Sequence, residues 1–175
     1  MQNNTQLTHN DHLRSDKKFP LSIIASDLTS PLNVGSLFRL CDALGVEQLY
    51  LCGDTPAPPN AKISKTSRST EKHVDYELHA NAETLVRSLR DSGSTIVSLE
   101  ITSSSIAIGS DEFKNLLTVD KPVCLILGSE NSGVNHALLS LSEATIHIPM
   151  FGNNSSMNVI TAASIACFEI SRNLL

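Results

Sequence analysis

Short apolar runs alternate with amphipathic stretches between residues 20 and 172. Six runs have the length and apolar content of buried strands, and they lie at residues 21–26, 47–52, 74–78, 94–101, 123–127 and 144–148. Apolar residues at helical spacing predict helices at residues 33–44, 81–91, 111–117, 134–141 and 156–172. This alternation predicts an α/β fold: a mostly parallel six-stranded sheet with helices on both faces.

The first 19 residues are polar and have no hydrophobic period, which predicts a flexible tail at residues 1–19. Arg14, Lys17 and Lys18 make the end of this tail basic, so it is either a solvated tail or an arm that grips RNA. The remaining residues, 20–175, have the length and apolar content of one domain with a single core.

The composition of the chain indicates its cellular compartment and limits the classes of partner that it can bind. The formal net charge of −5 argues against binding of nucleic acid through bulk charge and leaves only local basic patches. Cys41, Cys52, Cys124 and Cys167 stand in apolar runs without a C-x-x-C pair, a pattern typical of buried thiols in a reducing compartment. The sequence has no apolar run of about 18 residues, no signal peptide and no histidines at metal-ligand spacing. We therefore expect a cytoplasmic protein with no membrane and no metal partner.

Two loops rich in Gly, Ser and Asn follow predicted strands, at residues 127–134 and 148–159. Gly128, Gly133 and Gly152 let the backbone turn sharply and approach a ligand closely. Because ligands of α/β proteins bind at the carboxyl ends of strands, the loops predict a small-molecule site, although either loop alone also fits an ordinary strand-to-helix turn. A G-x-G-x-x-G fingerprint, a P-loop and a G-x-S-x-G elbow are missing from the sequence, which disfavours common nucleotide binders and hydrolases.

Basic residues are concentrated between residues 62 and 72, where K-I-S-K-T-S-R-S-T-E-K has no apolar period. Lys and Arg supply charge and Ser and Thr supply hydrogen bonds, so this segment is either an RNA phosphate-contacting loop or a solvated loop. Its candidate RNA-binding residues are Lys62, Lys65, Arg68 and Lys72. Arg39 and Asp42 are three residues apart on a predicted helix, where a surface ion pair is the simplest interpretation.

Three ordered motifs resemble those of the SpoU/TrmH class of SPOUT RNA ribose 2′-O-methyltransferases. They are N-V-G-S-L-F-R from Asn33, L-G-S-E-N-S-G-V from Leu127 and I-P-M-F-G-N-N-S-S-M-N-V from Ile148, and K-T-S-R-S-T-E from Lys65 resembles the basic loop of the same class. The resemblance spans residues 20–172. It implies a carboxyl-terminal deep trefoil knot, S-adenosyl-L-methionine bound in that knot, a homodimer formed through the helices flanking the knot, and methylation of tRNA or rRNA.

The resemblance also assigns roles to single residues. It implies that the cofactor is held by backbone groups of Leu99, Gly128, Ile148, Met150, Ser156 and Met157. The reacting site would be built by Asn33, Arg39, Glu130 and Asn158, with Arg39 reaching across the dimer. We expect Arg39 to anchor a phosphate and orient the hydroxyl, because guanidinium normally stays protonated. Glu130 either receives the proton or holds its loop.

The chain departs from the resemblance in its third motif, where Met157 replaces the commoner leucine, a mild change, and also at two further places. Ile160 replaces the serine that usually follows N-V, and Arg68, Ser69 and Thr70 stand where the basic loop usually reads L-G-A, which affects RNA specificity more than cofactor binding. An RNA-binding member without activity and a generic nucleotide-binding module are the competing hypotheses. We expect tRNA rather than rRNA as the substrate, because the sequence has no added RNA-binding domain and no long carboxyl-terminal extension.

Overall fold

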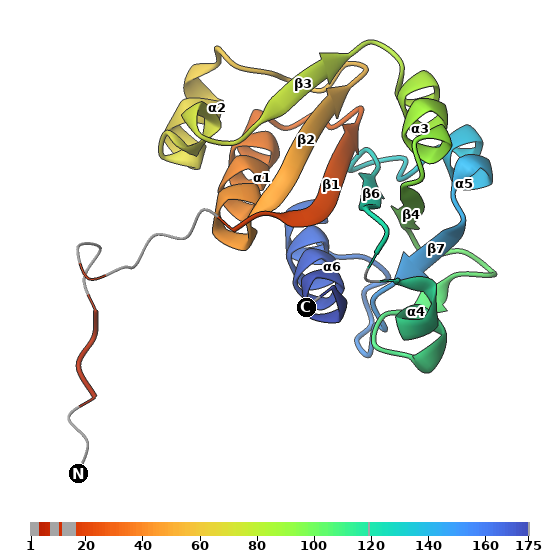
Figure 1. Ribbon diagram of the computed structural model, residues 1–175. Coiled ribbons are helices and arrows are strands. Elements are labelled where there is room, and N and C mark those ends of the chain that lie inside the picture. The colour runs from red at the N-terminus through yellow and green to blue at the C-terminus, as the bar shows by residue number, and fades with distance from the viewer. Residues whose placement is uncertain (1–3, 8–10, 12–16, 119, 175) are drawn as a thin grey trace.

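The computed structural model describes residues 4–7, 11, 17–118 and 120–174 (Figure 1). Within these residues one sheet has the strand order β3-β2-β1-β6-β4-β7-β5, and all its pairings are parallel. The strands are β1 (Phe19–Ser26), β2 (Val46–Cys52), β3 (Tyr76–His79), β4 (Thr95–Leu99), β5 (Ile106–Ala107), β6 (Val123–Leu127) and β7 (Ala144–His147). The helices are α1 (Pro31–Leu44), α2 (Ala61–Ser67), α3 (Ala82–Asp91), α4 (Asp111–Leu116), α5 (His136–Leu141) and α6 (Val159–Asn173), with a 3₁₀ turn, η2 (Thr70–Lys72).

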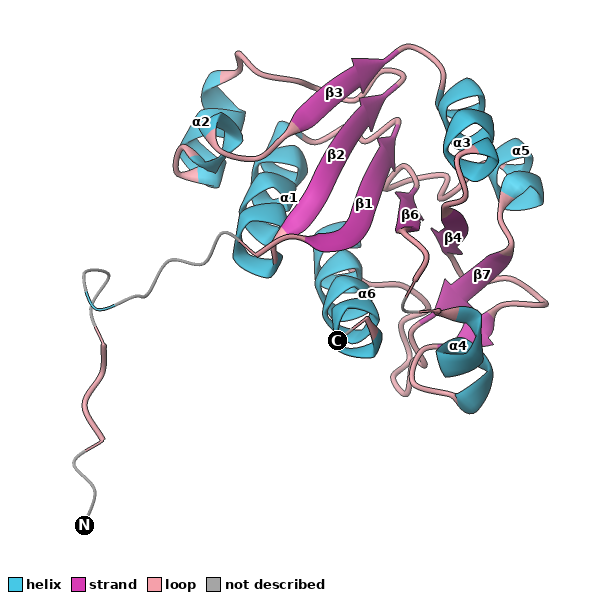
Figure 2. Cartoon of the chain, viewed as in Figure 1, coloured by secondary structure: helices cyan, strands magenta, loops and turns pink. Residues whose placement is uncertain are grey.

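Each face of the sheet has its own apolar core. Alternate residues of a strand point to opposite faces, so Leu21, Ile23 and Ala25 of β1 pack toward α1 and α6, whereas Ile24 packs toward α3 and α5. All four side chains are fully buried. Figure 2 shows α1 and α6 on one side of the strands and α3 and α5 on the other. The predicted α/β fold with helices on both faces is therefore confirmed.

The sheet has seven strands among the described residues, where the sequence pattern predicts six. The additional strand, β5, contains only Ile106 and Ala107 and pairs with the end of β7. Two residues are too few to establish the alternation that identifies a strand, and the surrounding stretch is rich in serine. The number of strands was thus predicted wrongly, while the six predicted strands are all present. The trefoil knot stays a prediction.

Two helices that carry motif residues begin at other positions than the sequence pattern predicts. Helix α1 begins at Pro31, because the Ser30 hydroxyl accepts a hydrogen bond from the backbone N–H of Asn33 and caps the helix. Asn33 therefore lies inside the first turn. Helix α6 begins at Val159, with Asn158 as its cap. In both cases the capping side chain, and not the apolar period, fixes the first residue.

The basic segment forms helix α2 and the turn η2, and the prediction of a loop was wrong. Ile63 is the one apolar residue of the helix that is fully buried, and it faces α1. A Cβ atom added at Gly35 of α1 would lie 2.8 Å from the Ile63 carbonyl oxygen, so the two helices approach closely. One buried apolar residue gives no period in the sequence, which explains why the helix is not apparent there.

The turn after α2 holds two residues in the left-handed region, Arg68 with φ 54° and Ser69 with φ 72°. Such a conformation costs a residue with a Cβ atom about 1 kcal/mol, and glycine adopts it without that cost. We expect Ser69→Gly to raise the unfolding free energy by about 0.5 kcal/mol, because the added freedom of the unfolded chain offsets part of the gain. Thermal unfolding measures this effect. Ser69→Ala keeps the Cβ atom and should give no gain, and an equal gain there would contradict the explanation.

The predicted flexible tail, residues 1–19, includes 1–3, 8–10 and 12–16, which lie outside the described residues. Its boundary is wrong by one residue, because Phe19 belongs to β1. Lys18 also contacts the domain, with its Nζ atom 3.4 Å from the Val46 carbonyl oxygen and 3.8 Å from Asp75 Oδ2.

In the described part of the chain, none of the helices has both the length and the apolar character that a membrane span needs. The four cysteines are buried and free, as predicted.

Candidate functional site

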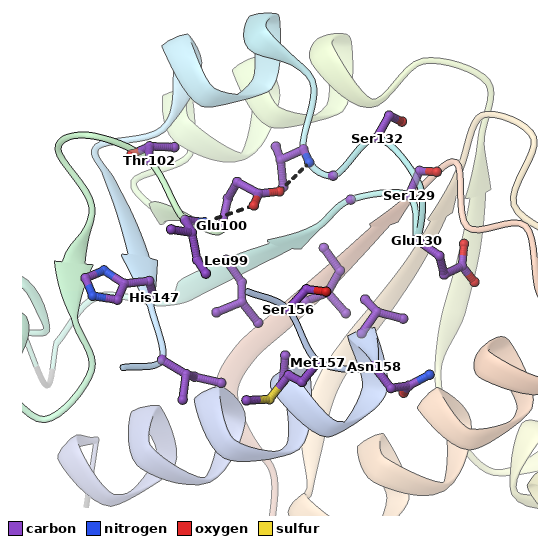
Figure 3. A pocket seen from close by; sticks show the side chains of 18 of the residues that line it. Leu99, Glu100, Thr102, Ser129, Glu130, Ser132, His147, Ser156, Met157 and Asn158 are labelled. Atoms are coloured by element: carbon purple, nitrogen blue, oxygen red, sulfur yellow. Dashed lines mark hydrogen bonds between the residues drawn. The ribbon is translucent and has the colours of Figure 1, made fainter. Parts of the chain in front are cut away.

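A cavity of about 610 Å³ lies at the carboxyl ends of β4, β6 and β7 and is bordered by the start of α6 (Figure 3). The chain reaches it through the two loops that the sequence pattern singles out, after Leu127 and before Val159. All six residues predicted to bind a cofactor line this cavity: Leu99, Gly128, Ile148, Met150, Ser156 and Met157. The structure thus gathers residues from three strands into one site, and its volume is typical of small-molecule pockets.

The loop after β6 is closed on itself by a pair of backbone hydrogen bonds. The Ser129 N–H donates to the Gly133 carbonyl oxygen at 3.2 Å, and the Gly133 N–H donates to the Ser129 carbonyl oxygen at 2.9 Å. A Cβ atom at Gly128 would overlap the backbone of Gly133 and Val134. Gly128 therefore allows the two sides of the loop to meet, which holds the intervening residues at the cavity.

Glu130 connects this loop to the start of α1. The Glu130 carboxylate accepts hydrogen bonds from the backbone N–H groups of Thr29 at 2.8 Å and Ser30 at 3.1 Å. It also accepts bonds from the Thr29 hydroxyl at 3.0 Å and the Asn33 amide at 2.7 Å. Strands β1 and β6 are neighbours, but the helices that follow them, α1 and α5, pack on opposite faces of the sheet. Glu130 thus lies where the chain leaves two neighbouring strands toward opposite faces of the sheet, which is a position at which α/β proteins bind ligands.

These hydrogen bonds determine the acidity of Glu130. Partial burial by itself would raise the pKa of the carboxyl group, but the hydrogen bonds donated by Thr29, Asn33 and Ser30 outweigh that effect. Together they lower the pKa of Glu130 to about 2. Glu130 is therefore a stable anion and a weak base near neutral pH.

The amides of Asn33 and Asn158 continue the chain of hydrogen bonds. Asn33 donates through Nδ2 to Glu130, and its Oδ1 accepts from Nδ2 of Asn158 at 3.3 Å. The Oδ1 atom of Asn158 accepts the backbone N–H groups of Ile160 at 2.9 Å and Thr161 at 3.4 Å. Each amide oxygen is therefore occupied, and each amide orientation is fixed by the next group. Residues from all three motifs meet at one edge of the cavity.

Comparisons with known proteins agree with this assembly of motifs. A family model described as the SpoU rRNA Methylase family matches residues 20–168. The chain belongs to this family.

Two curated relatives and one solved structure illustrate the family. The chain is 28% identical over 157 residues to a tRNA (guanosine(18)-2′-O)-methyltransferase of Thermus thermophilus, covering 89% of this chain and 76% of that protein. It is 29% identical over 172 residues to the 23S rRNA (guanosine-2′-O-)-methyltransferase RlmB of Vibrio parahaemolyticus, covering 97% and 67%. The structure of the SpoU methyltransferase AviRb from Streptomyces viridochromogenes with AdoMet matches with a TM-score of 0.73 and 25% identity. That match covers 91% of this chain and 61% of AviRb.

The cavity of this SpoU family member fits an adenosine cofactor chemically. Its walls combine apolar residues such as Leu99 and Met157 with Gly, Ser and Asn residues of the two loops. Two polar atoms of residues that line it, Thr102 Oγ1 and His147 Nδ1, are buried and have no hydrogen-bond partner among the described residues. Such atoms are normally satisfied, and because both are buried, a polar ligand would reach them only after a local rearrangement. The roles of the six cofactor residues nevertheless stay predictions.

Arg39 is the one predicted reacting-site residue that neither lines the cavity nor bonds to a residue that does, since Asn33 is bonded to Glu130 and Asn158. It is exposed on α1, six residues after Asn33, which is about 9 Å along a helix. Within the described part of the chain the Arg39 side chain is without a hydrogen-bond or ion-pair partner, so the ion pair with Asp42 is not formed there. Arg39 is free to contact another molecule.

The predicted RNA-binding residues lie apart from the cavity as well. Lys62, Lys65, Arg68 and Lys72 are exposed on α2 and the turn after it, and α2 packs against α1, the helix of Asn33.

Among described residues, no group of His, Cys, Asp and Glu could hold a metal ion. The sequence pattern also missed two site residues. Thr29 donates to Glu130, and Glu100 follows β4 and lines the cavity; their only signal was a polar residue after a buried strand.

Proposed function

We propose that this chain transfers a methyl group from S-adenosyl-L-methionine to a ribose 2′-hydroxyl of RNA. The observation that carries the proposal is the chain of hydrogen bonds from Glu130 through Asn33 to Asn158, at the edge of a cavity that all six predicted cofactor residues line. The relatives are named as 2′-O-methyltransferases of tRNA and of rRNA, and AviRb was solved with AdoMet. These names support the reaction and the cofactor.

The cofactor supplies an activated methyl group, and the residues of the chain supply position. Asn33 and Asn158 each use one amide hydrogen within the network and have a second hydrogen to donate to a ribose oxygen. Holding the reacting groups together accounts for much of the catalysis in such a displacement. Glu130, with a pKa of about 2, is too weak a base to take a hydroxyl proton near neutral pH. We therefore assign Glu130 to holding its own loop against the start of α1 and to fixing the Asn33 amide.

A homodimer would complete the site. Arg39 is exposed and lies outside the cavity of its own chain, so the Arg39 side chain of a second copy is the proposed phosphate anchor. Apolar side chains exposed on α1 and α6 support an interface there: Leu32 is 53% exposed, Ile165 41% and Phe168 56%. These two helices pack against one another, so a partner would contact both.

We favour tRNA as the substrate and the cytoplasm as the location. Of the two relatives named above, the tRNA enzyme is the one whose length this chain covers more fully, at 76% against 67%. The basic residues of α2 and the turn after it are placed to contact phosphates beside α1. The four free, buried cysteines support a reducing compartment.

The test is transfer of labelled methyl from S-adenosyl-L-methionine to total RNA of a strain that lacks the gene, followed by nucleoside analysis. A 2′-O-methylated nucleoside in the tRNA fraction is expected. Label only in the rRNA fraction would overturn the choice of tRNA, and cofactor binding without label in any RNA would favour an RNA-binding member without activity. Equal binding of ATP and NAD would instead favour a generic nucleotide-binding module.

Arg39→Ala is expected to lower kcat/KM for RNA about 10- to 100-fold and to leave the cofactor Kd unchanged, because the residue would contact only the RNA. Steady-state transfer and calorimetric binding measure the two quantities. Arg87→Ala is the matched control, since Arg87 is also an exposed helical arginine but lies on α3, on the opposite face of the sheet. Unchanged transfer by Arg39→Ala would remove Arg39 from the reacting site.

A further inference from the structure

Glu100 places a carboxylate on the wall of the cavity that no predicted role explains. It directly follows β4, and its backbone N–H donates to the Ile146 carbonyl oxygen of the neighbouring strand at 3.0 Å. Its Oε2 atom accepts the backbone N–H of Val134 at 3.0 Å, and its Oε1 atom accepts the N–H of Ile101 at 2.9 Å (Figure 3). Both carboxylate oxygens are thereby fixed in position.

The loop that carries Glu130 is shaped around this carboxylate. A Cβ atom at Gly133 would overlap Glu100 Oε2, and Gly133 has a φ of 66°, which favours glycine. Glu100 therefore reaches the loop from β4 through a space that only a glycine leaves open. Each of its oxygens accepts one hydrogen bond from the chain and retains a further lone pair.

The charges at the cavity are of one sign. Glu100 and Glu130 are the acidic residues that line it, and no Lys or Arg occurs among the described lining residues. The two carboxylates differ in their surroundings. Glu130 is surrounded by four donors from Thr29, Ser30 and Asn33, whereas Glu100 accepts two. Glu100 is therefore the less compensated negative charge at this wall.

We propose that Glu100 is a specificity-determining residue, whose fixed carboxylate favours the sulfonium-bearing cofactor over the product, which lacks the sulfonium charge. This inference rests on the proposed function. S-adenosyl-L-methionine carries a sulfonium charge in addition to its amino and carboxylate groups, and S-adenosylhomocysteine has lost it with the methyl group. The two molecules are otherwise nearly alike in shape, so a fixed negative charge on the cavity wall is a means to separate them.

The test compares three ligands by calorimetry: S-adenosyl-L-methionine, S-adenosylhomocysteine and sinefungin, an analogue that carries an amine in place of the sulfonium methyl. In Glu100→Gln we expect the first and third to bind about tenfold more weakly and the second to change less than about threefold. Glu100→Asp keeps the charge and should keep most of the preference. Glu143→Gln is the matched control, because the Glu143 carboxylate also accepts a backbone N–H of β4, from Ile96, but does not line the cavity.

The outcomes separate charge selection from a purely structural role. If Glu100 only braced the loop, Glu100→Gln would weaken all three ligands by the same factor, and that result would overturn the inference while leaving the proposed function intact. An unchanged ratio of the cofactor and product Kd values would do the same. If the wild-type protein bound none of the three ligands, the proposed cofactor itself would be wrong, and the assignment of Glu100 would fail with it.

Discussion

Replacing Glu130 with glutamine is expected to lower the rate of methyl transfer about 100-fold. The Glu130 carboxylate accepts four hydrogen bonds, from Thr29, Ser30 and Asn33. A glutamine has one acceptor oxygen, and its NH₂ group would face backbone N–H donors, so the loop and the Asn33 amide would move apart. A shift of about 1 Å at a reacting group costs on the order of 100-fold in rate. Single-turnover transfer to RNA at saturating cofactor measures this loss.

The same substitution is expected to lower the unfolding free energy at neutral pH by about 1–2 kcal/mol, after allowance for solvent screening of a partly exposed group. The pKa of Glu130 is about 2 in the folded protein, against about 4.5 for an ordinary glutamate. As the pH falls, the unfolded chain binds the proton first. The stabilisation is therefore complete above about pH 4.5 and is lost as the pH falls toward 2.

Denaturant unfolding of the wild-type protein and of Glu130→Gln between pH 2 and 7 tests the sign. The difference in stability should be largest near neutral pH and should shrink through the acid range. Glu130→Asp, which keeps the charge with a shorter side chain, should retain part of the pH dependence. A proton acceptor in the reaction would behave differently: its loss would change the pH profile of the transfer rate between pH 6 and 8, which we do not expect for Glu130.

The sequence pattern predicts the parts of this molecule whose side chains have a period. Strand β6 is buried on both faces and its sequence is a continuous apolar run. Helix α3 is capped by Asn81 and ends at Asp91. The predicted positions of both elements therefore agree with the structure. The motif residues Asn33, Glu130 and Asn158 could be assigned to one site only through the resemblance, because they are up to 125 residues apart. Their proximity depends on strand order, and no local pattern contains strand order.

Helix α2, strand β5 and the role of Glu100 have no hydrophobic period in the sequence that would predict them. Helix α2 has one fully buried apolar residue, Ile63, and its backbone approaches Gly35 of α1, and β5 contains two residues. Glu100 is equally invisible, because its partners are backbone N–H groups of Val134 and Ile101, and any residue except proline offers such a group. The sequence therefore predicts where the loops of the site lie, whereas the contacts that hold the loops together become apparent only in three dimensions.

Gly128→Ala is expected to abolish detectable cofactor binding and to lower the unfolding free energy by about 1–3 kcal/mol. A Cβ atom at this position would overlap the backbone of Gly133 and Val134, which no side-chain rotation can relieve. The loop would have to open, which breaks the paired hydrogen bonds of Ser129 and Gly133 and withdraws Glu130 from α1. Calorimetric titration with S-adenosyl-L-methionine and thermal unfolding measure the two effects.

Gly152→Ala is the control for this substitution, because Gly152 lies in the other loop of the site and a Cβ atom added there meets nothing within 4 Å. It should bind the cofactor as the wild-type protein does. Wild-type affinity in Gly128→Ala would show that the loop opens at little cost, and the closed loop would then not be what forms the cavity. Loss of binding in Gly128→Ala alone would instead show that cofactor binding requires the backbone of Gly133 and Val134 to lie against residue 128, which only glycine allows.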